Sequence, residues 1–483
     1  MLVATLALLC VGAGPGDGVA LAADDLAAQP AAARPHLRYL SLYAVPERQR
    51  AEWAKVLAFH CNSLSREAEL TPPVLVGPDL LRVSLKDYGW DPAVWDRLAR
   101  VDPYHHATVQ TEKVTEEQRY HPGGEVNGTY YAPGNYTFRT REKVKALAAA
   151  PWLPAKEAAY LAAETRSLAP VVRGDWFLSQ TAIQKDRVAG YYDFLGLGKS
   201  QKDFEKLVGA DEAAAKRVKR EIKAIVARSG VTLQNRVINR YGAITGGYWI
   251  TYDYKESTAR RNVLRFLDRD VDPEDGDAAE SYGVLPNGLF AFFLADGQGV
   301  RQDTAPDFIA SDSQATGTDR RVHIGMSCIR CHVEGIRPID DWARKVYRGN
   351  LKLAAVDHDQ FTRFRQLYLS DLSRWVRRDS ADYAEVLLGL TGWKPADAAR
   401  AYGRAWDAYV EADLTLDAVA LEAGYPAATV AAALRTYATP GKGIPPLDPI
   451  LAGLIAEEPV PMRRDHFEEV YPLLQKILLG YKP

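Results

Sequence analysis

The sequence predicts a mixed α+β protein in which helix predominates, and three observations favour this fold class. Between about residues 35 and 166, short strand-like and helix-like patterns alternate. The apolar segment 283–303 has the alternation and the turn residues of a β-hairpin. From residue 340 onward, apolar residues recur at helical spacing. We therefore expect an α/β N-terminal unit, a middle part with a β-hairpin, and a helical C-terminal unit.

The length of the chain favours more than one packed unit. It has 483 residues, 47% of them hydrophobic, whereas single hydrophobic cores stop growing near roughly 250–300 residues. The divisions that we expect are a signal peptide at 1–22, an N-terminal unit at 35–166, a helical and hairpin unit at 167–320, and a last unit at 321–483.

Residues 1–22 have the features of a secretory signal peptide, although basic residues do not precede the apolar run. That run is followed by Ala20-Leu21-Ala22, a small-x-small pattern typical of a cleavage site. No later segment has the ~18–20 continuous apolar residues of a membrane-spanning helix. We therefore expect an exported bacterial chain, periplasmic or secreted, without a membrane span after cleavage.

In the N-terminal unit, strands and helices are expected to alternate. The patterns predict strands at 38–45 and 80–88, and helices at 46–63 and 90–101. The segment 121–138 is rich in glycine, asparagine and tyrosine, which predicts a long ordered loop or a hairpin.

The middle of the chain is expected to begin with helix and continue into strands. A charged helix is predicted at 211–229 and a strand at 248–254. The acidic loop 268–277 lacks the glycine and glutamate that an EF-hand calcium loop requires. The hairpin that follows is expected to turn at Asp296–Gly299.

The C-terminal unit is expected to be almost wholly helical. Helical spacing is clear at 361–376, 381–390, 399–412 and 467–480. The segment 414–434 resembles a DNA-binding helix-turn-helix, but in an exported chain of nearly neutral charge we expect two packed helices instead.

The segment Cys328-Ile329-Arg330-Cys331-His332 carries the chemistry, because it contains the pattern C-x-x-C-H. Two thiols three residues apart on one helical turn can each bond to a vinyl group of the same porphyrin. The next residue, His332, can then place an imidazole nitrogen on the iron. We therefore predict one covalently attached haem c, bound by Cys328 and Cys331 with His332 as proximal ligand, and enclosed by the helical C-terminal unit.

Two other uses of the motif fit less well. A zinc site needs further ligands, usually a second C-x-x-C or H-x-x-x-H, and neither accompanies this motif. A thioredoxin-like pair would follow a strand in a βαβ setting, whereas a polar loop precedes this motif. Removal of Cys10 with the signal would leave three cysteines, which argues against a disulfide framework, and Cys61 is expected to be a buried apolar side chain.

The sixth iron ligand is less well defined by the sequence. Met1 would leave with the signal, and Met326 lies on the attachment segment itself, so Met462 is the candidate methionine for the distal position. The histidine alternatives are His60, His105, His106, His121, His323, His358 and His466.

Two functional classes remain open, and electron transfer is the one that we expect. A second firm axial ligand would suit the transfer of single electrons to a periplasmic redox partner protein. An open sixth position would suit a haem enzyme or a sensor of gas or peroxide. A haem with a mainly structural role is a third possibility. The formal charge of −2 gives no indication of nucleic-acid binding.

The chain resembles a family of large secreted haem c proteins common in planctomycete-type bacteria. The resemblance implies a haem-binding, electron-transferring protein and brings no settled substrate. Family members tend to have tryptophan and histidine in place of Arg66 and Glu67, and they also differ at 280–283. The segments that carry the resemblance include NSLSRE, LLRVSLKDYGWD, APVVRGDWF, YYDFLGLG, SGVTLQNRVINRYG, GGYWITYDY, VLPNGLFAFFLADGQGVRQDTAPDFIASD and GMSCIRCHVEGIRP.

Overall fold

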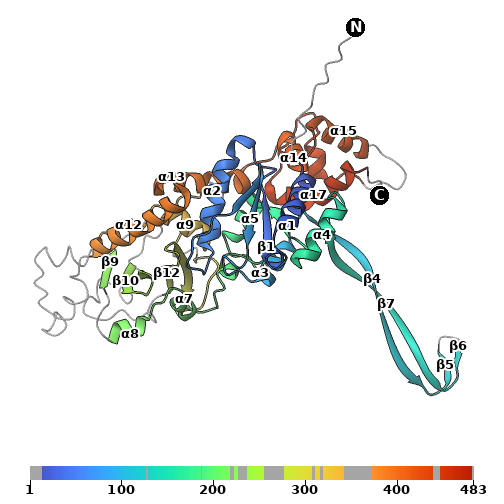
Figure 1. The fold of residues 1–483 in the computed structure, drawn as a ribbon, viewed down its shortest axis with the longest axis horizontal. Coiled ribbons are helices and arrows are strands. Elements are labelled where there is room, and N and C mark those ends of the chain that lie inside the picture. The colour runs from blue at the N-terminus through green and yellow to red at the C-terminus, as the bar shows by residue number, and fades with distance from the viewer. Residues whose placement is uncertain are drawn as a thin grey trace, which may run out of the picture.

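The structure, a computed structural model, is a mixed α and β fold, as the sequence predicts (Figure 1). It describes residues 14–126, 129–186, 188–217, 222–226, 236–254, 277–306, 310–315, 319–341, 372–438 and 446–480.

The N-terminal part contains a four-stranded sheet in the order β2-β3-β1-β8. Strand β1 pairs antiparallel with β3 and parallel with β8, so the sheet takes its last strand from beyond residue 166, within the predicted second unit. The strands expected at 38–45 and 80–88 correspond to β1 and β3. The bounds are β1 (Leu37–Ser41), β2 (Val74–Gly77), β3 (Leu80–Ser84) and β8 (Val171–Arg173).

Helices pack around this sheet, and the two expected from the sequence are present. They are α2 (Glu47–Ser63) and α3 (Pro92–Ala99). The 3₁₀ turn η1 (Arg34–His36), α4 (Ala155–Thr165), α5 (Gly174–Thr181), α6 (Tyr191–Phe194) and α7 (Gln201–Leu207) complete this part.

Helix α1 (Pro15–Ala28) overlaps the segment predicted as a signal peptide. Its residues Val19, Ala22 and Leu26 are buried in a core that they share with one face of the sheet. The Asp25 carboxylate accepts a hydrogen bond from the Tyr39 hydroxyl at 2.8 Å. Cleavage after Ala22 would therefore divide a packed helix; residues 1–13 lie outside the described part.

A long β-ribbon projects from the body of the molecule (Figure 1). It consists of β4 (His106–His121) and β7 (Gly134–Ala149), which pair antiparallel along their whole length. At ~3.4 Å per residue, 16 residues correspond to roughly 50 Å. The tip carries β5 (Gly124–Val126) and β6 (Thr129–Tyr131), so the segment 121–138 belongs to the end of a hairpin.

The middle part contains a five-stranded antiparallel sheet in the order β13-β12-β11-β10-β9. Its strands are β9 (Ile222–Val226), β10 (Arg236–Gly242), β11 (Gly247–Asp253), β12 (Ala278–Val284) and β13 (Phe290–Asp296). Strand β11 is the one expected at 248–254. The acidic loop 268–277 lies outside the described residues except for its last position.

The prediction of a charged helix at 211–229 is wrong for the second half of that segment. Helix α8 covers only Glu212–Arg217, and Ile222–Val226 forms the edge strand β9. The β9 backbone pairs with β10, and Ala224 and Ile225 are fully buried. Pairing with β10 outweighs the helix propensity of this short segment.

The hairpin of the middle part turns earlier than predicted. Strands β12 and β13 pair through the turn at 285–289. The expected turn at Asp296–Gly299 is also present, but it is followed only by an isolated bridge between Ala295 and Arg301. The apolar alternation therefore predicted β13 correctly and its partner strand incorrectly.

The C-terminal part is helical, as expected. Its described helices are α12 (Leu372–Thr391), α13 (Pro395–Trp406) with the π-helical turn η4 (Asp407–Glu411), α14 (Leu416–Ala423), α15 (Ala427–Ala438), α16 (Pro449–Gly453) and α17 (Arg464–Leu478). Helices α14 and α15 are the two packed helices expected at 414–434. Of the segment 361–376, only the end is described.

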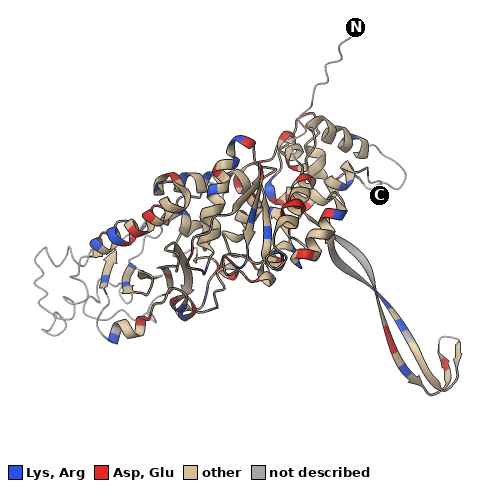
Figure 2. Ribbon diagram, in the orientation of Figure 1, with Lys and Arg blue, Asp and Glu red and all other residues tan. Residues whose placement is uncertain are grey.

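One hydrophobic core runs through all three predicted units, from Leu40 to Ile477. Charged residues of both signs are interspersed along the described part of the chain (Figure 2). Among the described residues there is no helix with the length and apolar character that crossing a membrane requires.

Candidate functional site

The C-x-x-C-H motif lies on the short helix α9 (Met326–His332), as the motif's spacing predicts. The helix starts at Gly325, whose φ is +78°. A Cβ atom at this position would lie 2.4 Å from the carbonyl oxygen of Ala182. Because only glycine avoids both the strain and this overlap, Gly325 fixes where the helix begins.

Hydrogen bonds to neighbouring segments hold the C-terminal half of α9 and the residues that follow it. Near its end, Arg330 Nη1 donates to the carbonyl oxygen of Gln314 at 2.7 Å. Beyond the helix, the Ile336 backbone N–H donates to Ser380 Oγ on α12 at 2.9 Å. The buried side chains of Met326 and Ile329 join the core. These hydrogen bonds and buried side chains together fix the position of the motif helix.

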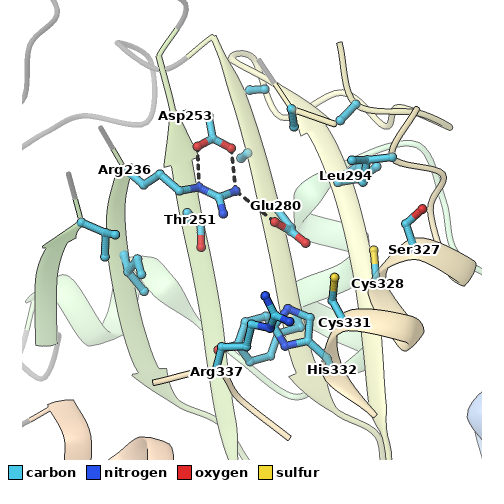
Figure 3. Close-up of a pocket in the computed structure, with 18 of the residues that line it drawn as sticks. Arg236, Thr251, Asp253, Glu280, Leu294, Ser327, Cys328, Cys331, His332 and Arg337 are labelled. Atoms are coloured by element: carbon cyan, nitrogen blue, oxygen red, sulfur yellow. Dashed lines mark hydrogen bonds and ion pairs between the residues drawn. The ribbon is translucent and has the colours of Figure 1, made fainter. Parts of the chain in front are cut away.

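A cavity of about 440 Å³ separates α9 from the five-stranded sheet (Figure 3). Cys328, Cys331 and His332 all line it, and the two sulfur atoms face the space between helix and sheet. The described lining residues all fall between Val226 and Asp340. The described wall is therefore formed by the sheet, by described residues of the segment 302–322 and by the motif segment, and the prediction that the C-terminal helices enclose this site is wrong for the described residues.

The His332 imidazole contacts the aromatic rings of the sheet. Its ring centroid lies 5.1 Å from that of Tyr282 and 5.7 Å from that of Phe292. His332 Nδ1 is buried and has no hydrogen-bond partner among the described residues. Burial lowers the pKa of His332, and the Glu280 carboxylate opposes this shift. The neutral ring keeps a nitrogen lone pair available for a metal.

The two motif cysteines are free thiols. Cys328 is buried and Cys331 is half-buried. Burial, followed by the nearby Glu280 carboxylate, raises the pKa of Cys331 to about 11 and holds the pKa of Cys328 well above its usual value. A catalytic thiol–disulfide pair needs a lowered thiol pKa, so these values disfavour a thioredoxin-like role.

A buried charged cluster, which the sequence analysis did not identify, lies on the sheet wall of the cavity. Arg236 donates two hydrogen bonds to the Asp253 carboxylate, at 2.6 and 2.7 Å, and one to Glu280 Oε2 at 3.0 Å (Figure 3). Arg337, beside His332, is a further cation of the wall and is exposed. The available signal was Asp253, the one charged residue of strand β11.

The structure does not bring Met462 to this cavity. Met462 is buried among the C-terminal helices, where its backbone pairs with Leu414. His332 is the only histidine among the described lining residues, and these residues include no methionine.

The histidines proposed for the distal position lie elsewhere or outside the described residues. His60 bonds with Tyr402 and Thr181, and His323 with Asp319. His105 bonds with Asp102, and His106 with the carbonyl oxygen of Leu168. His121 belongs to the ribbon and His466 is exposed on α17. His358 lies outside the described residues.

The residues present fit a covalently held haem better than a bare metal ion. The cavity lies within the ~300–1,000 Å³ typical of small-molecule sites, and it brings two thiols and a histidine with an unpartnered nitrogen to one space. Within the described part of the chain, no group of three or more histidine, cysteine or carboxylate side chains could hold a metal ion.

No protein-family model matches the chain, and neither a curated protein nor a solved structure is significantly similar to it.

Proposed function

We propose that this chain is a mono-haem c-type cytochrome that transfers single electrons. The observation that carries the proposal is the convergence of Cys328, Cys331 and His332 on one cavity between α9 and the sheet. A motif that occurred by chance would have no reason to face a space of this size.

Each of these residues has a defined task in the proposal. The sulfur atoms of Cys328 and Cys331 form the two thioether bonds, which hold the group permanently. His332 supplies the proximal nitrogen, and Tyr282 and Phe292 restrict the orientation of its ring. Most of the surface that lines the cavity is apolar, which suits a porphyrin ring. When bound, haem supplies an iron centre that cycles between ferrous and ferric states.

Export and a redox partner belong to the same proposal. Haem is attached to C-x-x-C-H motifs outside the cytoplasm, which favours a periplasmic or secreted location. An electron-transfer role also requires a protein that delivers or accepts electrons, and its identity is open.

A second candidate function, binding or conversion of a small molecule at an open sixth position, is favoured by one observation. The described residues that line the cavity include no histidine or methionine besides His332. A displaceable sixth position would suit a gas or peroxide ligand.

The visible spectrum of protein exported from a host with haem c maturation distinguishes the two. It should be recorded oxidised, reduced, and reduced under carbon monoxide. A sharp low-spin reduced spectrum that carbon monoxide leaves unchanged supports electron transfer. A spectrum that shifts with carbon monoxide supports the open-site function, and the absence of any haem spectrum contradicts both.

A further inference from the structure

Glu280 occupies a central position in the cavity wall. It lies on β12 two residues before Tyr282, so both side chains are on the face of the sheet that is turned toward α9. Figure 3 shows the Glu280 carboxylate between the Arg236 guanidinium and the motif helix. Its side chain is 18% exposed.

Among the residues that the structure describes, the ion-paired cluster that contains Glu280 has two carboxylates and one guanidinium group. The Arg236 guanidinium forms a bidentate ion pair with Asp253 and donates one hydrogen bond to Glu280, so two carboxylates share it. One guanidinium thus balances two carboxylates. Burial of an incompletely compensated charge disfavours folding, so stability alone does not account for this arrangement.

Glu280 lines the same cavity as the motif residues Cys328, Cys331 and His332. Its carboxylate is therefore the charge of the cluster that shares this space with the motif helix (Figure 3). The opposing cation near His332, Arg337, is exposed, so solvent screens its charge more strongly. Asp312, also on the wall, faces Arg330 at 3.8 Å.

We propose that Glu280, oriented by Arg236, is the positioning residue that lowers the reduction potential of the haem site. The inference rests on the proposed haem function. Reduction adds one electron to the site, and a fixed negative charge in a cavity of low dielectric disfavours that additional charge. The carboxylate therefore stabilises the oxidised site relative to the reduced one.

The test is a potentiometric titration of the full-length, haem-attached chain and three variants. Glu280→Gln removes the charge at nearly constant shape and should raise the midpoint potential. Glu280→Asp keeps the charge and should stay close to the wild type. Glu334→Gln, two residues after His332 but exposed, is the matched control and should give a clearly smaller shift.

The outcomes separate this inference from the proposed function. An unchanged potential in Glu280→Gln with intact haem attachment overturns the inference alone, as does an equal shift in Glu334→Gln. A wild-type chain without a haem spectrum overturns the proposed function and the inference with it. If Glu280→Gln does not fold, Glu280→Leu, an apolar group of similar volume, should give the same upward shift, and no shift overturns the inference.

Discussion

The imidazole of His332 lies against the phenol ring of Tyr282, with their centroids 5.1 Å apart and their planes tilted by 32°. This contact joins the motif helix α9 to strand β12 of the five-stranded sheet. The sheet therefore orients the side chain that we propose as the iron ligand, although about fifty residues separate the two in sequence.

Replacement of His332 by alanine should leave haem attached and change its spectrum. Both thiols remain, so the thioether bonds can form, but the proximal nitrogen is lost. Haem content should be measured after denaturation and spectra recorded in both redox states. His323→Ala is the control, because His323 bonds with Asp319 and does not line the cavity. An unchanged spectrum in His332→Ala would contradict the assignment of the ligand.

Replacement of Gly325 by alanine should destabilise the chain and reduce haem attachment. The residue has a φ of +78°, and a Cβ would lie 2.4 Å from the carbonyl oxygen of Ala182. Backbone strain alone costs on the order of 1–3 kcal/mol. Gly389→Ala is the matched control, since Gly389 lies in helix α12 with open space at its Cβ position.

Chemical denaturation gives the free energies of unfolding of the wild type and of both glycine variants. Gly389→Ala should be neutral or stabilising by up to about 1 kcal/mol, because alanine favours helix. Equal free energies of unfolding for wild type and Gly325→Ala would show that α9 does not start as described.

The buried His60 should make stability fall as the solution is acidified. His60 is fully buried. The Thr181 hydroxyl donates its proton to the carbonyl oxygen of Phe177, so it accepts a hydrogen bond from His60 Nε2. His60 Nδ1 therefore carries no proton and accepts a hydrogen bond from the Tyr402 hydroxyl. Burial lowers the pKa of His60 to about 3. In the unfolded chain, the imidazole of His60 takes up a proton near pH 6.5. The contribution of neutral His60 to the free energy of unfolding is therefore complete above that pH and is lost as the pH falls toward 3.

Urea unfolding between pH 7 and pH 4.5 checks this expectation. For this one group, the wild type should lose about 1.4 kcal/mol per pH unit below its unfolded pKa. His60→Gln should lack that part of the slope. Identical slopes for the two proteins would mean that His60 does not stay neutral in the folded state.

The role of helix α1 in the mature chain can be tested at Val19 and Leu26. Both are buried, and they lie on opposite sides of the predicted cleavage after Ala22. Leu26→Ala should cost about 2–5 kcal/mol in any case. Val19→Ala should also destabilise exported, purified protein if α1 stays intact. No effect of Val19→Ala would instead support cleavage after Ala22. Asp24→Ala, on the exposed side of the helix, is the control.

Local sequence signals predicted the elements whose formation depends mainly on their own residues. The helix at Glu47–Ser63 and the pair α14 and α15 follow directly from helical spacing. Strand β9 was missed because its five residues form a strand only by pairing with β10. For the same reason the hairpin turn was predicted after β13, where glycine and aspartate are frequent, whereas the structure has it before β13.

The site shows the same division between local and distant information. The positions of Cys328, Cys331 and His332 on one helical turn could be predicted, because C-x-x-C-H is a local motif. The cluster of Arg236, Asp253 and Glu280 could not, because its members lie on three strands that come together only in the folded sheet. The distal candidate Met462 was chosen by elimination, and nothing local indicated where its side chain would lie.

The most direct test of the central claim is the intact mass of exported chain, measured under denaturing conditions. The wild type should carry the additional mass of one haem, which should be absent from the variant in which Cys328 and Cys331 are both alanine. A wild-type chain with no added mass, despite expression with the haem c maturation machinery, would contradict the account.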